Sequence, residues 1–342
     1  MKKLIVLATL AALPAVAMAD VTISGNLAVG IVNTKASGSG SLTTEDRTSG
    51  EIKFAGSDDL GNGLKGIWQI ASRINLADTA DGNTFAGRDS YVGLEGGFGR
   101  LTLGNIYLMP TSGAMAIFEN DSATWKSSIY DQGDRYNNTV SYKTPSFSGF
   151  TATVQHSFGS GTTSSVDDTT READKLYSQA ISLAYEGDGW TVSYDASRSK
   201  LDTLGTTSDT KYKTLHELNA SVTLSDLTLM AGYARGVNNF PSDDDGEGTV
   251  TAPTVDHVKR SGWGLAASYA LGNFTPKIGF WKEGDAKADG ENANDGHKTW
   301  AVGVEYALSK RTRAGVELVK VNYDDNATAD LREATIYLGT KF

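Results

Sequence analysis

Apolar residues alternate with small, polar or charged residues along most of this chain, and this period of two constrains the fold more than any other feature. Residues 299–308 read TWAVGVEYAL, which places Trp300, Val302 and Val304 on one face and Gly303 and Glu305 on the other. Other segments, among them GWTVSYDAS and GWGLAASYA, repeat this pattern with a tryptophan near the start. A period of two is the signature of a β-strand with one apolar face. The sequence therefore predicts an all-β fold.

The connections between these segments indicate how the strands are arranged. Short turns, such as residues 95–99 and 187–189, alternate with long polar connections, such as residues 34–48, 109–134, 159–176 and 284–297. Counting between them predicts sixteen strands, with about 20 residues for each strand and its connection, as in barrels that cross an outer membrane. The predicted strands begin near Val21, Gly50, Leu64, Arg88, Arg100, Arg135, Phe150, Tyr177, Trp190, Thr214, Leu227, Lys259, Asn273, Lys298, Thr312 and Leu331. A soluble β-sandwich would alternate in the same way. Closure of so many strands removes their exposed edges, however, and favours a sixteen-stranded antiparallel transmembrane β-barrel.

The first residues resemble a secretory signal peptide. Lys2 and Lys3 precede an apolar stretch, and Ala17-Met18-Ala19 supplies the small residues that a signal peptidase accepts. We predict cleavage after Ala19, so that residues 1–19 are a signal peptide and residues 20–342 form one barrel domain. An N-terminal membrane anchor, the alternative, needs a longer apolar run without such a site.

Composition excludes several other classes. The chain has no cysteine, so an exported protein of this kind must hold together without disulfides. Beyond the signal peptide no apolar run approaches the roughly 18 residues of a membrane-spanning helix. The net charge is −10 and becomes −12 once Lys2 and Lys3 are removed, which argues against a nucleic-acid partner.

Four stretches carry a resemblance to a known family. They are VTISGNLAVGIV (21–32), KFAGSDDLGNGLKGIWQI (53–70), GRDSYVGLEGGFGRLTLGN (87–105) and NNTVSYKTPSFSGFTATV (137–154). These segments resemble the general porins of Gram-negative bacteria, of the type common in β-proteobacteria. The resemblance implies a trimer of sixteen-stranded barrels in the outer membrane. It also implies that the long third loop, residues 109–134, is folded into each lumen as a constriction.

The composition of the third connection fits that role. It contains apolar residues, including Phe118 and Trp125, that a freely solvated loop would not need. It also carries acidic residues, of which Glu119, Asp121 and Asp131 are the candidates for one side of the constriction. Opposite charges on facing walls would orient polar solutes and set the ion preference.

Basic side chains on the strands are the candidates for the facing wall. Alternation places Arg73 and Lys53 inward, with Glu51 beside Lys53, and it places Arg135 on the face shared by Asn137, Thr139 and Ser141. By resemblance, Arg88 and Arg135 occupy positions where such porins keep pore arginines. Two departures matter: Glu51 stands where another pore arginine is common, and Arg88 shares its face with outward residues, so that it reaches the lumen only at a bulge or a strand end. Local charges lining the narrowest point outweigh screened loop charges, so we predict mild anion selectivity.

The sequence shows little sign of catalysis or cofactor binding. The four histidines are scattered without a metal-ligand spacing, and no phosphate-binding loop or GxSxG pattern occurs. We therefore expect a passive channel for ions and small hydrophilic solutes, without a catalytic site, resident metal or cofactor. An outer-membrane barrel enzyme, a sugar-specific porin, and calcium binding by the acidic loop SDDDGEG (242–248) are the weaker alternatives.

The chain ends on an alternating strand, ATIYLGTKF, that terminates in Phe342. We expect residues 331–342 to pair with residues 21–32 and so close the barrel. A terminal aromatic residue resembles the signal read by the outer-membrane barrel assembly machinery. The partners expected for this chain are that machinery, two further copies in a homotrimer, outer-membrane lipid and lipopolysaccharide, and the permeating solutes.

Overall fold

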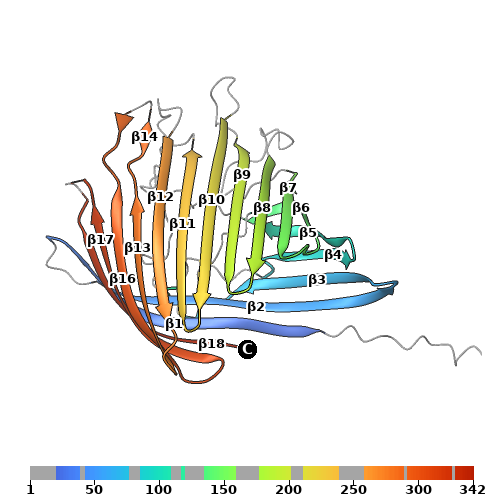
Figure 1. Ribbon diagram of the computed structural model, residues 1–342, viewed down its shortest axis with the longest axis horizontal. Coiled ribbons are helices and arrows are strands. Elements are labelled where there is room, and N and C mark those ends of the chain that lie inside the picture. Colours follow the sequence, from blue (N-terminus) through green and yellow to red (C-terminus); the bar gives the residue numbers. More distant parts are fainter. Residues whose placement is uncertain are drawn as a thin grey trace, which may run out of the picture.

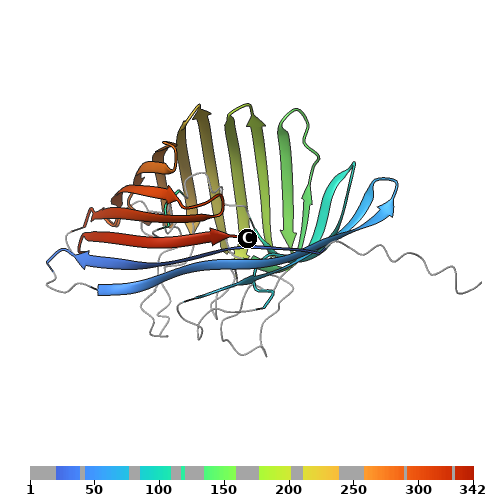
Figure 2. The same cartoon turned by 90° about the horizontal axis from the view of Figure 1, so that it is seen from below.

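The computed structural model of the chain describes residues 21–38, 43–76, 85–108, 117–119, 135–158, 177–201, 211–238, 258–288, 291–325 and 328–342. The described residues form a single antiparallel sheet that curves round on itself (Figures 1 and 2). None of them belongs to a helix that is long and apolar enough to cross a membrane.

Sixteen long strands and one small hairpin make up this sheet in the described part of the chain. Each long strand is hydrogen-bonded to two neighbours, and β1 pairs with both β2 and β18, so the ring is closed. The prediction of a sixteen-stranded antiparallel barrel is confirmed. The long strands are β1 (Thr22–Ala36), β2 (Thr43–Gly61), β3 (Leu64–Arg73), β4 (Ser90–Gly96), β5 (Gly99–Tyr107), β6 (Arg135–Lys143), β7 (Phe150–Ser157), β8 (Tyr177–Gly187), β9 (Trp190–Leu201), β10 (Lys211–Leu224), β11 (Leu227–Asn238), β12 (Val258–Tyr269), β13 (Phe274–Glu283), β16 (His297–Ala307), β17 (Thr312–Tyr323) and β18 (Leu331–Lys341).

The two ends of the described chain close the ring. β1 and β18 are in register from Asn26 opposite Lys341 to Ala36 opposite Leu331. Beyond this ladder, the backbone N–H of Gly25 donates to the Phe342 carbonyl at 2.9 Å, and the Phe342 N–H donates back to the Gly25 carbonyl at 3.0 Å. The expected pairing of the first and last strands is therefore confirmed, and Phe342 itself contributes two of its hydrogen bonds.

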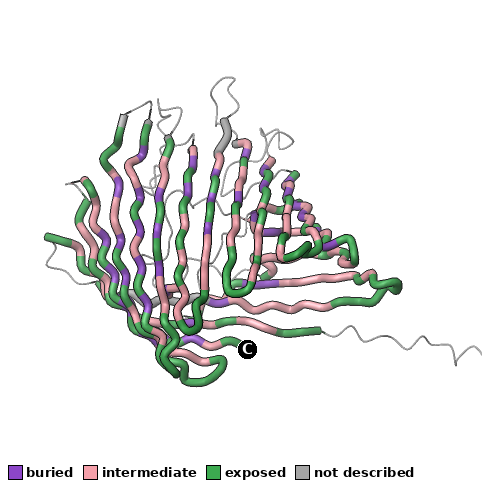
Figure 3. Tube along the Cα trace, in the orientation of Figure 1, coloured by how far each residue is buried: buried purple, intermediate pink, exposed green. Residues whose placement is uncertain are grey.

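Side chains alternate between the lumen and the outer surface, which gives the striped colouring of Figure 3. On β16, Trp300 and Val302 are 50% and 46% exposed, whereas Thr299 and Ala301, which alternate with them, are buried. The exposed members are the apolar ones because they face the hydrocarbon of a membrane in this kind of barrel. The small and polar members face inward and determine the polarity and charge of the surface that lines the lumen.

Aromatic side chains gather toward both ends of the outer face. Trp263, Phe280 and Trp300 lie in a row across β12, β13 and β16, with ring centroids 5.3 and 4.4 Å apart. Phe274 and Tyr306 form a second contact, at 4.7 Å, near the opposite ends of β13 and β16. Such belts at the two membrane–water interfaces are typical of outer-membrane barrels.

Short turns join the strands at one end of the barrel. Asn62 and Gly63 form the two-residue turn between β2 and β3, and both have positive φ angles, of 53° and 76°. A two-residue turn with φ above zero at both positions matches the twist of the flanking strands, and Asn-Gly is the pair that best adopts it. The glycine-rich segment 60–66 therefore contains this two-residue turn and the ends of the two strands that it joins.

Two predicted connections contain more strand than expected. β1 and β2 continue pairing as far as Thr34 opposite Thr43, although we predicted a connection over residues 34–48 and a second strand from about Gly50. Residues 284–297 contain the short strands β14 (Lys287–Ala288) and β15 (Glu291–Asn292), which pair with one another and extend the sheet beside β12. Backbone pairing does not stop where the apolar pattern stops, so the pattern underestimates strand length.

Candidate functional site

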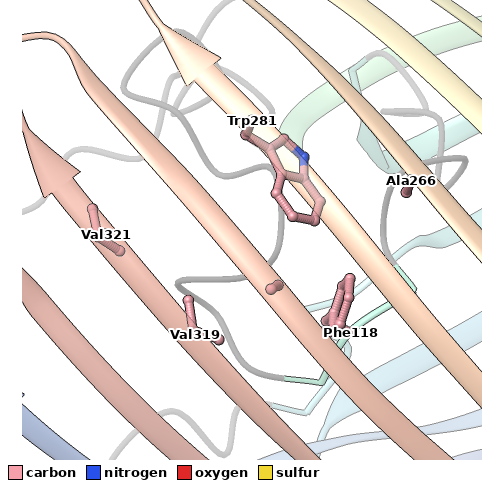
Figure 4. Close-up of a cluster of buried hydrophobic side chains, with 6 residues drawn as sticks. Phe118, Ala266, Trp281, Val319 and Val321 are labelled. Carbon is pink, nitrogen blue, oxygen red and sulfur yellow. The ribbon is translucent and has the colours of Figure 1, made fainter.

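The described part of the third connection lies against the inner wall of the barrel. The Phe118 side chain is 4% exposed and packs in a buried cluster with inward residues of β12, β13, β16 and β17. Its ring meets the edge of Trp281 with a centroid distance of 5.8 Å and an interplanar angle of 71° (Figure 4). The other buried members of the cluster are Ala266, Ala301, Val319 and Val321. Burial of an aromatic side chain at this point holds residues 117–119 to the wall.

An ion pair on the wall binds the backbone of the same segment. Lys277 of β13 lies 2.6 Å from the Glu317 carboxylate of β17, and the two side chains are 4% and 0% exposed. The Lys277 ammonium also donates to the Ile117 carbonyl at 2.6 Å, and the Glu119 N–H donates to the Glu317 carboxylate at 2.9 Å. We call Lys277 and Glu317, together with these two backbone contacts, the loop clamp.

The Glu119 side chain is engaged by a second group of charges. Its carboxylate pairs with Arg313 of β17, and the Arg313 Nε lies 3.4 Å from Glu305 of β16. Tyr337 of β18 donates its hydroxyl to the same Glu305 carboxylate at 2.9 Å. Glu119 is therefore anchored to the wall through both its side chain and its backbone. Asp121 and Asp131, the other two predicted acidic residues of this loop, lie outside the described residues.

Basic residues predicted for the facing wall occur on β2 and β3. Glu51 and Arg73 are opposite one another in register, and Lys53 is opposite the fully buried Ala71. Lys53 and Glu51 form an ion pair of 2.6 Å, with side chains 41% and 17% exposed. The carboxylate of Glu51 thus offsets one of the positive charges on this part of the wall.

Arg88 and Arg135 lie together a short way round the ring. Arg88 precedes β4 instead of lying within it, so the outward alternation of that strand does not apply to it. Burial lowers the pKa of the Arg88 guanidinium, and the neighbouring charge of Arg135 lowers it further. Both arginines line a cavity of about 460 Å³ with Asp89, Tyr107 and Gln155.

Arg135 is fixed by two contacts in that cavity. Its Nε donates to the Asp89 carboxylate at 2.8 Å, and its guanidinium lies 5.0 Å from the centre of the Tyr107 ring. Asp89 also accepts from the Tyr107 N–H at 3.1 Å, so one carboxylate orients both partners. An arginine held in this way is preorganised to meet an anion with its remaining N–H groups.

The regular alternation assumed for β6 is interrupted. The register against β5 shifts between Gly104 and Ile106, and Asn138 has a φ of 54°. Thr139 and Ser141 are buried as expected, but Asn137 is exposed, and Tyr136 instead packs against a buried cluster. The predicted common face of Arg135, Asn137, Thr139 and Ser141 is therefore broken, because a bulge inserts one residue and reverses the alternation beyond it. Arg135 is placed by its contacts with Asp89 and Tyr107, and the alternation does not locate it.

The charges on β13, β16 and β17 were not predicted from the sequence. Lys277, Glu305, Arg313 and Glu317 all hold or approach the third connection in the structure. A signal for two of them was present, because Lys277 precedes the outward Ile278, and Glu317 lies between the outward Val316 and Leu318. A charged residue at an inward position of a spanning strand faces the lumen.

Comparisons with known proteins agree with this architecture. Residues 6–326 match the family described as Gram-negative porin. The chain belongs to the Gram-negative porin family. It is 30% identical to the major outer membrane protein P.IB of Neisseria lactamica over 339 residues, which cover 92% of this chain and 91% of that protein. The corresponding protein of Neisseria meningitidis serogroup B is 27% identical over 327 residues, with the same two coverages.

A solved structure shows the same fold. The anion-selective porin from Comamonas acidovorans superposes with a TM-score of 0.73 at 20% identity, covering 95% of this chain and 100% of that one. Membership of the porin family decides between a channel and a barrel enzyme in favour of the channel. This porin is an outer-membrane diffusion channel of a Gram-negative bacterium.

Proposed function

We propose that this porin passes ions and small hydrophilic solutes with a mild preference for anions, and that residues 109–134 form its constriction. The observation that carries the proposal is the grouping of Lys53, Arg73, Arg88 and Arg135 around β2–β6, where only Glu51 and Asp89 oppose them in the contacts described above. Four positive and two negative groups leave an excess of two positive charges. The porin from Comamonas acidovorans, which has the same fold, is anion-selective, and this supports the same sign.

The geometry of the lumen supports a field across the channel. Along β13, β16 and β17, which lie across the ring from β5–β7, Glu119, Glu305 and Glu317 contact or approach Lys277 and Arg313, which leaves one excess negative charge. A wall with excess positive charge opposite a wall with slight negative charge produces a transverse field. Such a field orients dipolar solutes and draws anions toward β2–β6.

Reversal potentials under a salt gradient test the anion preference. We expect Arg135→Gln and Arg73→Gln to move the reversal potential toward cation preference, because each removes one positive charge from the narrow part of the lumen. Arg100→Gln is the matched control, since Arg100 is exposed at the start of β5 and pairs with Glu95 beside a short turn. Unchanged potentials in both the Arg135 and Arg73 variants would remove these residues from the constriction.

We also propose that the mature protein, cleaved after Ala19, is a homotrimer that contacts lipopolysaccharide and outer-membrane lipid. The outward faces of β1 and β18 support this, because Ile31 and Ile336 are 56% and 65% exposed and offer apolar surface to a second copy or to lipid. Mass measurement by light scattering in mild detergent tests the trimer. A monomeric mass would contradict it and leave the barrel intact.

A further inference from the structure

Two carboxylates face the lumen side by side on strands that the proposed constriction does not use. Asp195 of β9 and Glu217 of β10 are opposite one another in the antiparallel register. Both belong to the inward set of their strands, with exposures of 1% and 2%. Residues in this relation have Cβ atoms about 5 Å apart, so the two acidic groups are direct neighbours.

Further oxygen atoms surround this pair. Asn219, two residues beyond Glu217 on the same face, donates its Nδ2 to the Glu217 Oε1 at 2.6 Å. The Asn219 Oδ1 is buried without a hydrogen-bond partner, in a side chain of a residue only 2% exposed. The Nδ2 end of this amide is turned toward Glu217, and half a turn of the amide exchanges the two ends and brings the orphaned carbonyl to the carboxylate pair. Ser193, opposite Asn219 in register, also has a buried hydroxyl without a partner.

Asp195 is the least satisfied member of the group. The Ser182 and Ser193 hydroxyls are its polar neighbours, yet neither carboxylate oxygen makes a hydrogen bond of good geometry. Within the described part of the chain, no lysine, arginine or histidine forms an ion pair with it. A carboxylate enclosed to this degree beside a second one is strongly unfavourable unless a positive charge or a proton joins the group.

An apolar cap adjoins the pair and limits its contact with water. Leu215 precedes Glu217 by two residues on the same face, and Ala234 of β11 is the register partner of Glu217. Both are buried in a cluster with Ala180 and with Leu108, the residue that follows β5. Electrostatic attraction is stronger in such a place than in open solvent.

We infer that Asp195, Glu217, Asn219 and Ser193 form a binding site for a divalent cation, with Ca²⁺ as the best fit. All the available ligand atoms are oxygens, and two carboxylates, an amide carbonyl and a hydroxyl are the donors that hard cations take. Ca²⁺ accepts irregular geometry and completes its shell with water, whereas Mg²⁺ demands near-ideal octahedral geometry. The described residues contain no group of three or more His, Cys, Asp or Glu that could hold a metal, so this site relies on neutral oxygens for half its ligands.

Occupancy would change the charge of the lumen wall. One bound divalent cation would add two positive charges to the part of the wall formed by β9 and β10. This consequence rests on the proposed anion selectivity, but cation binding itself does not. Bound Ca²⁺ is therefore expected to raise the anion preference, and its removal by EGTA to lower it.

Titration of the purified full-length porin with Ca²⁺ after EGTA treatment tests the site, with binding followed by calorimetry. We expect Asp195→Asn to weaken the affinity about tenfold or more, since Ca²⁺ affinity depends on the number of ligand charges. Asn219→Ala keeps both carboxylates and should weaken binding less. Asp188→Asn, in the exposed turn between β8 and β9, is the matched control and should bind as the unaltered protein does.

A second control separates this site from the acidic segment 242–248, which lies outside the described residues. Replacement of Asp243, Asp244 and Asp245 by asparagine should leave the Asp195-dependent binding unchanged. Failure of the unaltered protein to bind Ca²⁺, or equal affinity in the Asp195 and Asp188 variants, would overturn the inference. Binding without any change in reversal potential would support the site and count against the proposed selectivity alone.

Discussion

Removal of the Lys277 ammonium is the sharpest test of the loop clamp. We consider Lys277→Met, which keeps the length of the side chain and its apolar stem but removes its charge. The change leaves the Glu317 carboxylate, whose side chain is 0% exposed, without its cation. Breaking a buried ion pair from one side costs about 3–5 kcal/mol, most of it from the charge that remains buried.

The same substitution releases the backbone of the third connection. The ammonium donates to the Ile117 carbonyl at 2.6 Å and lies 5.0 Å from the centre of the Phe118 ring. A hydrogen bond from a charged donor contributes about 1.5–3 kcal/mol. Loss of about 2 kcal/mol from the docked state multiplies the released fraction of residues 117–119 about 30-fold.

Two measurements follow these effects. Urea unfolding in lipid vesicles should show the loss of stability, and single-channel recordings should show larger fluctuations of the open current. Lys282→Met is the matched control on the same strand, because Lys282 is exposed on the opposite face. Its effect on unfolding should stay within about 0.5 kcal/mol.

A double variant, Lys277→Met with Glu317→Met, separates the interaction between the two side chains from the effect of each single substitution. Replacing both charges removes the buried carboxylate that has lost the Lys277 ammonium, so most of the stability should return. The current fluctuations should remain, because Ile117 and Glu119 still lack their partners. Equal behaviour of Lys277→Met and Lys282→Met, or a double variant as unstable as the sum of its single changes, would refute the clamp.

Three further predictions concern packing and assembly. Phe118→Ala should cost about 3–5 kcal/mol of docking and packing free energy, seen as increased current noise and as protease cleavage of the third connection. Gly315→Ala should destabilise the barrel by about 1–3 kcal/mol in urea unfolding, because its Cβ would lie 2.4 Å from the Tyr337 ring, whereas Gly97→Ala, in an open turn, should have little effect. Deletion of Phe342 removes two backbone hydrogen bonds to Gly25 and should lower the amount of protein in outer-membrane fractions; normal insertion of the shortened chain would show that the terminal residue is not needed for assembly.

The strands could be predicted from the sequence because alternate residues of each strand face the outer surface and the lumen, and these two environments select apolar and polar side chains respectively. The starts of β3, β6, β7, β8, β9, β11, β17 and β18 coincide with the predicted positions for this reason. The extension of β1 and β2 beyond the membrane could not be predicted in the same way. Both faces are polar there, so pairing continues without an alternation to reveal it.

The lumen was predictable only in part. The alternation places Lys53, Glu51 and Arg73 correctly relative to their neighbours, since β2 and β3 are regular at that point. The alternation fails around Asn137. A single inserted residue exchanges the two faces of a strand, and the amino-acid sequence does not reveal where the insertion occurs. The partners of Glu119 could not be predicted either. They depend on where the third connection contacts the wall, and a local sequence pattern does not determine that position.

The loop clamp also bears on the order in which the channel assembles. Ile117 and Lys277 are 160 residues apart in sequence, and Glu119 and Glu317 are 198 residues apart. Contacts between such distant segments form late, because the intervening chain must first be brought together. The anchors on β13 and β17 become available only once the last quarter of the chain has joined the sheet. A sheet interrupted before that stage would be open at one edge and would also lack the anchors for residues 117–119, so closure of the channel and docking of this segment depend on the same late strands.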